Sequence, residues 1–407
     1  MQTALAAHIR DTADGQEADR ILRACVHCGF CTATCPTYQL LGDELDGPRG
    51  RIYQIKQVLE GHPANPTVRE HLDRCLTCRA CETTCPSGVN YHRLLDIGRA
   101  HVERQTKRPL LQRLQRRAMI ELLAYRSRFT PMLRLGQLVR PLMPRKLRAN
   151  VPKRVALPAH PAAAPTTRKV IVLDGCVQPG LAPEINHALE RVLQPLGVAV
   201  ARATGAGCCG ALPHHLNDSE RAREMARRNI DAWLPLVDAG AEAIIVTASG
   251  CGAHVADYPH LLADDADYAA KARRIAELAQ DPLQFVAAQP LERLTHKART
   301  ARIAVHTPCT LQHALKLNGA AEAVLTRLGY TLCDVGEGHL CCGSAGTYSI
   351  LQPELSQQLR RRKLAALNVD RPDLVVTANI GCLMHLGDPD GVPVRHWLNL
   401  VADDLQA

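Results

Sequence analysis

The sequence predicts an α/β protein that begins with an all-α module and continues as a duplicated parallel-sheet domain. Two runs with the same cysteine spacing lie within the first hundred residues, and segments with helical periodicity surround them. A cysteine-containing pattern of strands and helices occurs twice in the rest of the chain. The 407 residues suffice for two or three domains, and we divide them into 1–100, 101–167, 168–295 and 296–407.

The two cysteine runs are the most specific feature of the chain. They are Cys25-Val-His-Cys28-Gly-Phe-Cys31-Thr-Ala-Thr-Cys35-Pro36 and Cys75-Leu-Thr-Cys78-Arg-Ala-Cys81-Glu-Thr-Thr-Cys85-Pro86. Each has the spacing C-x2-C-x2-C-x3-C-P of bacterial two-cluster ferredoxins, in which the fourth cysteine ligates the other cluster. This spacing predicts two [4Fe–4S] clusters, one on Cys25, Cys28, Cys31 and Cys85 and the other on Cys75, Cys78, Cys81 and Cys35.

Four thiolates also suit zinc, but the x3 spacing before proline, present twice, favours iron–sulfur clusters. The 39 residues between Cys35 and Cys75 are too many for a small hairpin-linked ferredoxin. Residues 17–24, 52–60 and 67–72 have helical spacing, so we expect an α-helical two-cluster module. This module resembles the helical ferredoxin domain of succinate dehydrogenase-type iron–sulfur subunits.

The segment 101–167 is basic. Residues 99–154 contain 16 Lys or Arg and two acidic residues, a local surplus of 14, whereas the whole chain carries +9. One interpretation is a solvated helical face; the other is contact with an anionic membrane surface or an acidic partner. A stripe at helical intervals favours the second interpretation: Leu110, Leu111, Leu114, Met119, Leu122 and Leu123. Aromatic residues make up only 3% of the chain, which argues against nucleic-acid binding, and residues 156–167 form a Pro/Ala linker.

The remainder of the chain is an internal repeat. Cys176 corresponds to Cys309, the pair at 208–209 to that at 341–342, and Cys251 to Cys382, with offsets of 133, 133 and 131 residues. The apolar segment 243–247 and the helical segment 220–237 are typical of parallel strands joined by crossover helices. The cysteines follow the carboxyl ends of the expected strands, which is where open α/β sheets bind ligands.

Each repeat contains Cys-Cys-Gly and resembles the cysteine-rich CCG domain of heterodisulfide reductase subunits. That family closes its motif with C-x2-C, whereas this chain has Cys251-Gly-Ala-His254 and Cys382-Leu-Met-His385. The resemblance implies a third cluster in the second repeat on Cys309, Cys341, Cys342 and Cys382, with His385 as a ligand or a neighbour of one. For the first repeat, a cluster and a set of buried structural thiols remain alternatives for Cys176, Cys208, Cys209 and Cys251.

The sequence contains no phosphate-binding P-loop. One G-x-G-x-x-G match at residues 205–210 overlaps the first Cys-Cys-Gly loop and is not repeated in the second, so we interpret it as accidental. We therefore expect no organic-substrate chemistry in this chain alone and a flavoprotein partner that performs it. Neither an export signal nor a long apolar run is evident, which indicates a cytoplasmic location.

The order of these parts, together with residues 21–51 and 339–348, resembles the iron–sulfur subunits of bacterial glycolate oxidase, or glycolate dehydrogenase. The resemblance implies an electron-transfer subunit that serves FAD-containing subunits oxidising glycolate to glyoxylate. It also implies electron delivery to quinone from the inner face of the cytoplasmic membrane. Alternatives are a heterodisulfide-reductase-like enzyme, or the iron–sulfur or anchoring subunit of a related lactate or glycerol-3-phosphate dehydrogenase.

Overall fold

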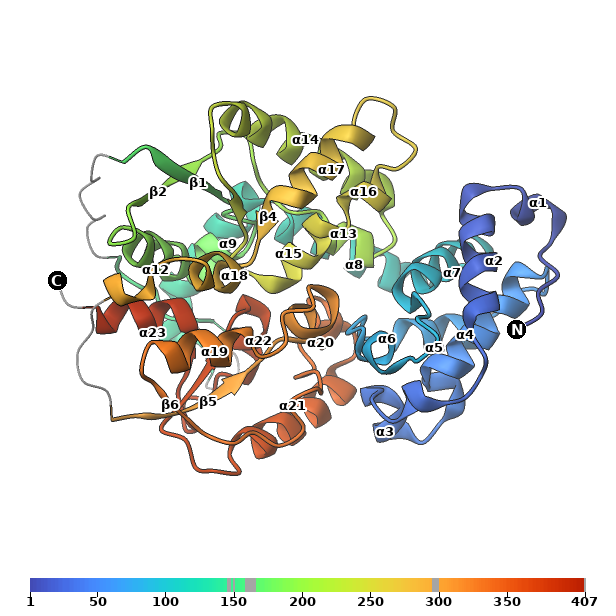
Figure 1. Cartoon of the computed structure of the whole chain (residues 1–407). Coiled ribbons are helices and arrows are strands. Elements are labelled where there is room, and N and C mark those ends of the chain that lie inside the picture. The colour runs from blue at the N-terminus through green and yellow to red at the C-terminus, as the bar shows by residue number, and fades with distance from the viewer. Residues whose placement is uncertain (145–147, 149–150, 158–165, 295–299, 406–407) are drawn as a thin grey trace.

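The computed structural model describes residues 1–144, 148, 151–157, 166–294 and 300–405. A helical module lies at one end of the molecule, and two units with parallel sheets lie at the other (Figure 1). This arrangement confirms the predicted fold class. Arg145, Lys146, most of the expected linker and the expected boundary between the two repeats lie outside the described residues.

The N-terminal module is built entirely of helices in the described chain. Proline occupies the first turn of three of them, where its missing N–H is not needed. Gly98 lets two of the helices approach closely, since a Cβ there would lie 2.5 Å from the side chain of Ile55. The helices are α1 (Ala7–Arg10), α2 (Ala13–Ala24), α3 (Pro36–Leu41), α4 (Pro48–Leu59), α5 (Pro66–Asp73), α6 (Ala80–Thr84) and α7 (Tyr91–Gln105).

The basic segment forms two helices, α8 (Leu110–Leu123) and α9 (Arg126–Val139). Helix α8 connects the N-terminal module to the first sheet unit. Arg116 pairs with Asp73 of α5 at 3.2 Å, while Met119 and Ile120 pack against Leu216. Only the C-terminal half of α8 is therefore buried, and its leucines near the start remain exposed.

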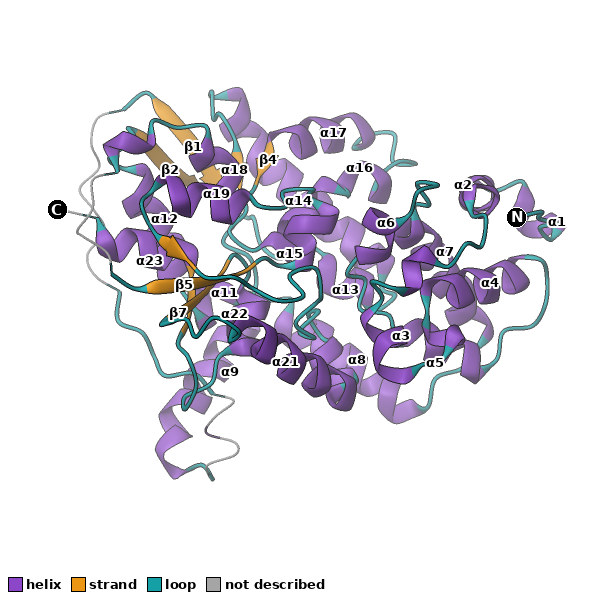
Figure 2. Cartoon of the chain, turned by 60° about the horizontal axis from the view of Figure 1, so that its bottom comes forward, coloured by secondary structure: helices purple, strands orange, loops and turns teal. Residues whose placement is uncertain are grey.

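The two sheets have the same topology, as the duplication predicts. The first contains β1 (Arg168–Val172), β2 (Val198–Arg202), β3 (Ile244–Ile245) and β4 (Ala279–Gln280), and all its pairings are parallel, in the order β2-β1-β3-β4. The second contains β5 (Arg302–His306), β6 (Thr331–Leu332), β7 (Leu374–Thr377) and β8 (Val394–His396), in the order β6-β5-β7-β8, again parallel. The strands are drawn in orange in Figure 2.

Helices connect the strands in both units (Figure 2). In the first unit they are α11 (Gln178–Leu181), α12 (Glu184–Leu193), α13 (Ala211–His215), α14 (Ser219–Asp238), α15 (Ser249–Ala256), α16 (Tyr258–Leu261), α17 (Ala269–Leu278) and α18 (Pro282–Ala287). In the second they are α19 (Ala320–Arg327), α20 (Tyr348–Leu351), α21 (Pro353–Leu367), α22 (Ile380–Leu386) and α23 (Trp397–Asp404), with the π-helical turn η5 (Thr310–Ala314) after β5.

One hydrophobic core joins the two repeats. It includes Val172 and Ile245 from the first repeat and Val376 and Trp397 from the second. The loops that follow the central strands also meet, since Ser249 Oγ lies 2.8 Å from Thr310 Oγ1. The cysteine loops of both repeats are thereby held on a shared framework. Within the described ranges, no helix combines the length and apolar character needed to cross a bilayer.

Candidate metal centres

The two ferredoxin-type runs form matching turns. Residues two and four positions after the first cysteine have positive φ in both runs: His27 and Gly29 in one, Thr77 and Arg79 in the other. Left-handed backbone is unfavourable for threonine and arginine, so other contacts must hold the second turn. Arg79 provides one of these contacts, because its guanidinium pairs with Asp257 of the first repeat.

The structure brings the eight thiols together in two adjacent cavities. One cavity is lined by Cys25, Cys28, Cys31 and Cys85, and the other by Cys35, Cys75, Cys78 and Cys81. The fourth cysteine of each run thus lies with the first three of the other, and the ligand exchange between the two clusters stays a prediction. The cavities share part of their lining, namely Pro48, Cys81 and Tyr91.

The chemistry of these cavities suits an iron–sulfur cluster. All seventeen cysteines of the chain are free of disulfides. Burial, followed by repulsion from Cys25, Cys85 and Cys28, raises the pKa of the Cys31 thiol to about 11. Iron cations would relieve this repulsion between thiolates, because a bound metal is the dominant local charge. The residues present therefore fit the cluster that the sequence predicts.

A buried charge network supports the connection between the two runs. Arg51 and Asp46 are almost fully buried and pair at 3.2 Å, and Arg74, which precedes Cys75, donates to the other oxygen of Asp46 at 2.9 Å. Arg51 also donates to Thr37 Oγ1, which lies 3.4 Å from Cys35 Sγ. The network links the fourth cysteine of the first run to the first cysteine of the second, and the sequence analysis did not single it out.

The second repeat gathers its four predicted thiols. Cys309 Sγ lies 3.8 Å from Cys341 Sγ, and Cys342 Sγ lies 3.5 Å from Cys382 Sγ. The backbone N–H of Gly343 donates to Cys341 Sγ at 3.5 Å. Gly343 has a φ of 92°, and a Cβ on it would lie 2.6 Å from the carbonyl oxygen of Ser356. The glycine of this Cys-Cys-Gly motif is therefore required by both the conformation and the packing of the loop.

In the first repeat, the corresponding thiols contact one another in the same order as in the second. Cys176 and Cys209 donate hydrogen bonds to Cys208, which lower the pKa of the Cys208 thiol, and Cys209 also contacts Cys251. His254, at the closing position, is buried beside His214, with ring centroids 5.3 Å apart. His214 and His215 thus lie at the first Cys-Cys-Gly loop, as their sequence positions indicate. His214 Nε2 further lies 3.2 Å from Asp96 of α7.

The second ferredoxin-type cavity adjoins the thiols of the second repeat. Cys78, which lines that cavity, belongs to one apolar cluster with Leu76, Cys341 and Tyr348, and Cys309 packs against this cluster. Three groups of thiols therefore follow one another through the molecule, from the cavity around Cys28 to the second repeat.

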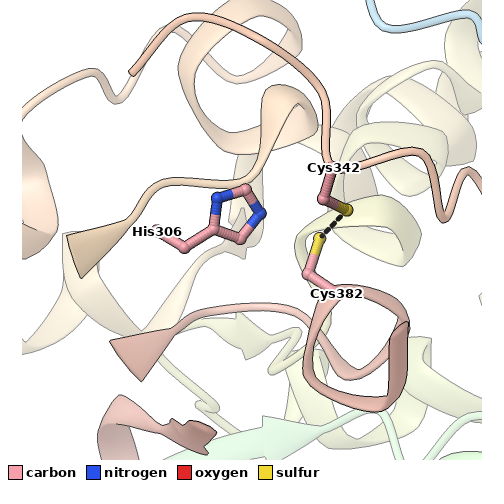
Figure 3. A group of neighbouring side chains, drawn as sticks. All are labelled: His306, Cys342 and Cys382. Atoms are coloured by element: carbon pink, nitrogen blue, oxygen red, sulfur yellow. Dashed lines mark hydrogen bonds between the residues drawn. The ribbon is translucent and has the colours of Figure 1, made fainter. Parts of the chain in front are cut away.

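Two histidines of the second repeat lie beside its thiols, and His385 is a neighbour of Cys342. His385 Nε2 lies 3.3 Å from Ser356 Oγ, and the ring also hydrogen-bonds to main-chain carbonyls of Ser356 and Cys342. His306 instead lies with Cys342 and Cys382, and their potential ligand atoms are all within 4.8 Å of one another (Figure 3). His306 was not among the ligands expected from the sequence. A signal was present, because His306 ends a strand three residues before Cys309, where the first repeat has Leu173.

Comparison with known proteins agrees with these sites. A family model described as a 4Fe-4S dicluster domain matches residues 21–89, and one described as a cysteine-rich domain matches residues 170–256 and 303–387. The chain therefore belongs to the class of iron–sulfur electron-transfer subunits that combine a dicluster module with a duplicated cysteine-rich domain. Iron–sulfur clusters are its cofactors, as the cysteine runs predict.

Relatives that cover most of the chain indicate its family within this class. The chain is 53% identical over 406 residues to the glycolate oxidase iron-sulfur subunit of Escherichia coli (strain K12), with 100% of both chains covered. It is 30% identical over 393 residues to the probable glycolate oxidase iron-sulfur subunit of Bacillus subtilis (strain 168), covering 89% of this chain and 87% of the relative. Lactate utilization protein A of Bacillus velezensis is 28% identical over 227 residues, 54% of this chain and 90% of that protein. The chain belongs to the glycolate oxidase iron–sulfur subunit family.

Proposed function

We propose that this chain is the electron-transfer subunit of a flavoprotein complex that oxidises glycolate to glyoxylate. It accepts electrons from FAD-containing subunits and delivers them to membrane quinone. Membership of the family supports the substrate, and the succession of three thiol groups from an exposed face into the second repeat is the observation that carries the electron-transfer role.

The proposed ligands are those that the two cavities bring together. Cys25, Cys28, Cys31 and Cys85 hold one [4Fe–4S] cluster, and Cys75, Cys78, Cys81 and Cys35 hold the other. A third cluster is held in the second repeat by Cys309, Cys341, Cys342 and Cys382. Bound clusters supply one-electron transfer, while the protein positions them and keeps water away from all but the outermost site.

We assign the docking face for the flavoprotein to the surface around Cys28. Cys28 is exposed, unlike Cys25 in the same run. Val26 and Phe30 flank it with 67% and 61% of their surface exposed; Val26 directly follows Cys25, and Phe30 directly precedes Cys31. A subunit interface would bury these side chains and bring the flavin close to the first cavity.

We assign membrane attachment to the start of α8. Leu110 and Leu111 are 64% and 77% exposed, and the exposed Arg113 and Arg117 lie within the next two turns. Arg116 belongs to the interior instead, since it pairs with Asp73. Exposed leucines beside arginines are typical of segments that contact an anionic lipid surface. This supports a peripheral position on the inner face of the cytoplasmic membrane.

Copurification and reduction test the proposal. The tagged chain, isolated from its own host, should bring FAD-containing subunits with it, and glycolate should then reduce its iron–sulfur clusters as seen by electron paramagnetic resonance. The flavin-free chain should not oxidise glycolate with an artificial dye. Clusters that stay oxidised when glycolate is added to the intact complex would exclude the proposed substrate. Dye reduction by the isolated chain would exclude the proposal that the FAD-containing subunits, and not this chain, oxidise glycolate.

A further inference from the structure

We propose that His306 is a ligand, through one of its ring nitrogens, of the iron–sulfur cluster in the second repeat. This inference rests on the third cluster proposed above and adds an imidazole to its four thiolates. His306 would then occupy the role that the sequence analysis considered for His385.

The position of His306 directs its ring at the thiols. It is the last residue of β5, and Cys309 follows three residues later at the start of η5. In Figure 3 the imidazole points toward Cys342 and Cys382, whose sulfur atoms lie 3.5 Å apart. The ligand atoms of these three residues lie within 4.8 Å of one another. The group combines the end of β5, the Cys-Cys-Gly loop and the first turn of α22, which follows β7.

The imidazole lacks any other partner among the described residues. His306 is 1% exposed, and both ring nitrogens are buried without a hydrogen bond. A buried polar ring left in this state is unfavourable, and neutral imidazole is among the commonest metal ligands in proteins. Coordination of iron by one nitrogen satisfies the group that the protein fold leaves unpaired.

The other candidate histidine is already engaged. His385 Nε2 lies beside Ser356 Oγ, and it also bonds to the carbonyl of Cys342. These contacts hold its ring against the backbone of the Cys-Cys-Gly loop. His385 therefore positions the loop, whereas His306 faces the thiols.

The ligand distinguishes the two repeats. Residue 306 corresponds to Leu173, which is buried in the first repeat and has no donor atom. A neutral imidazole adds a ligand without adding negative charge, so it keeps the reduction potential above that of a centre in which a thiolate takes its place, as the histidines of Rieske centres do. The buried ammonium of Lys363 acts in the same direction, because it interacts electrostatically with the four thiols. His306 and Lys363 would thus both keep the reduction potential of the proposed cluster above that of a centre with five thiolates.

Isotope labelling of the full chain tests the ligand directly. Protein carrying about twelve irons would be prepared with ¹⁴N- or ¹⁵N-histidine and measured by pulsed electron paramagnetic resonance in its oxidised and reduced states. We expect one cluster to show a nitrogen coupling that changes with the isotope. The coupling should be absent from His306→Leu, which introduces the residue that the first repeat carries naturally, and should persist in the control His385→Gln, whose side-chain amide can still donate to the loop.

A thiolate replacement gives a second readout. His306→Cys should keep the iron content and lower the reduction potential of one cluster. The inference is overturned if no isotope effect occurs in the wild type, if the effect survives in His306→Leu, or if it disappears in His385→Gln while the iron content is unchanged. An iron content of about eight in the wild type also overturns it, yet leaves the two ferredoxin-type clusters and the electron-transfer role standing. Failure of glycolate to reduce those two clusters would instead count against the proposed function.

Discussion

Thr83 Oγ1 and His313 Nδ1 lie 2.9 Å apart and join the second ferredoxin-type run to the second repeat. Thr83 belongs to α6, and His313 belongs to the turn that begins directly after Cys309. The opposite ring nitrogen of His313 lies 3.1 Å from the carbonyl oxygen of His339, two residues before Cys341. One imidazole therefore holds α6 against both loops that supply the Cys309 and Cys341 thiols.

Loss of this hydrogen bond should loosen the contact between the two thiol groups. Thr83→Val keeps the shape of the side chain but removes the donor, and we expect about 1 kcal/mol lower stability. Electron transfer from the ferredoxin-type clusters to the second repeat should slow, with iron content unchanged. Flash reduction followed by optical spectroscopy measures the rate, and Thr67→Val, at an exposed position in α5, serves as the control. Equal rates in both variants would contradict the prediction.

The exchange of the fourth cysteines predicts which cluster each variant loses. Cys35→Ser should damage the cluster on Cys75, Cys78 and Cys81, because Cys35 lines their cavity. Cys85→Ser should damage the other cluster for the same reason. Each variant should lose up to about four irons, and electron paramagnetic resonance distinguishes the clusters. The assignment fails if Cys35→Ser selectively removes the signal that depends on Cys25.

Gly343 should tolerate no side chain. Gly343→Ala places a Cβ against the Ser356 carbonyl and forces alanine into left-handed backbone, which costs about 1–3 kcal/mol for the backbone alone. We expect reduced thermal stability and loss of any cluster in the second repeat. Gly338→Ala is the matched control, since a Cβ there meets no atom within 4 Å. Similar melting temperatures for the two variants would refute the steric argument.

The start of α8 should confer salt-sensitive attachment. Arg113→Gln with Arg117→Gln removes two exposed charges, and each basic residue near an anionic surface contributes about 1 kcal/mol. Vesicles containing anionic lipid should bind this variant more weakly in sedimentation assays. Arg273→Gln with Arg361→Gln removes two exposed charges elsewhere and should bind like the wild type. Binding of the wild type that is the same at low and high salt would leave only the solvated-helix interpretation.

Two helix-capping residues should give the repeats opposite responses to pH. His396 caps α23, and burial lowers its pKa to about 4, so the neutral form is favoured in the folded protein. Its contribution to stability, about 3 kcal/mol, is present above pH 6.5 and lost as the pH falls toward 4. Asp281 caps α18 in the first repeat, and burial raises its pKa to about 7. Stability therefore decreases there as the pH rises from 4 to 7.

Asparagine substitution separates these two effects, because its side chain caps helices without titrating. The difference in unfolding free energy between the wild type and His396→Asn should shift in favour of the wild type as the pH rises from 4 to 6.5. For Asp281→Asn the difference should shift in favour of the variant between pH 4 and 7. Chemical denaturation at a series of pH values measures both, and pH-independent differences would contradict the assigned burial effects.

The cysteine positions carried much of what the sequence could predict. The spacing predicted that Cys35 and Cys85 exchange between sites. The duplication was evident because Cys176 and Cys309 are separated by the same 133 residues as the two Cys-Cys pairs. The environment of His306 was not predictable in this way, because the corresponding residue of the first repeat, Leu173, is not a histidine. Whether the His306 ring faces thiols or solvent depends on how the end of β5, the Cys-Cys-Gly loop and the start of α22 pack together. The burial of the Asp46–Arg51 pair was not predictable either, because charged residues ordinarily face water.

Helix α6 is only five residues long, yet both repeats hold the run that contains it. Arg79, directly before the helix, pairs with Asp257 of the first repeat, and Thr83 within it contacts His313 of the second. The second ferredoxin-type run therefore contacts both cysteine-rich repeats, the first through Arg79 and the second through Thr83. If only the second repeat binds iron through an imidazole, the two repeats differ in function: one conducts electrons, and the other supports the fold. A single side chain, His306, would then determine which of two otherwise similar repeats receives the electrons.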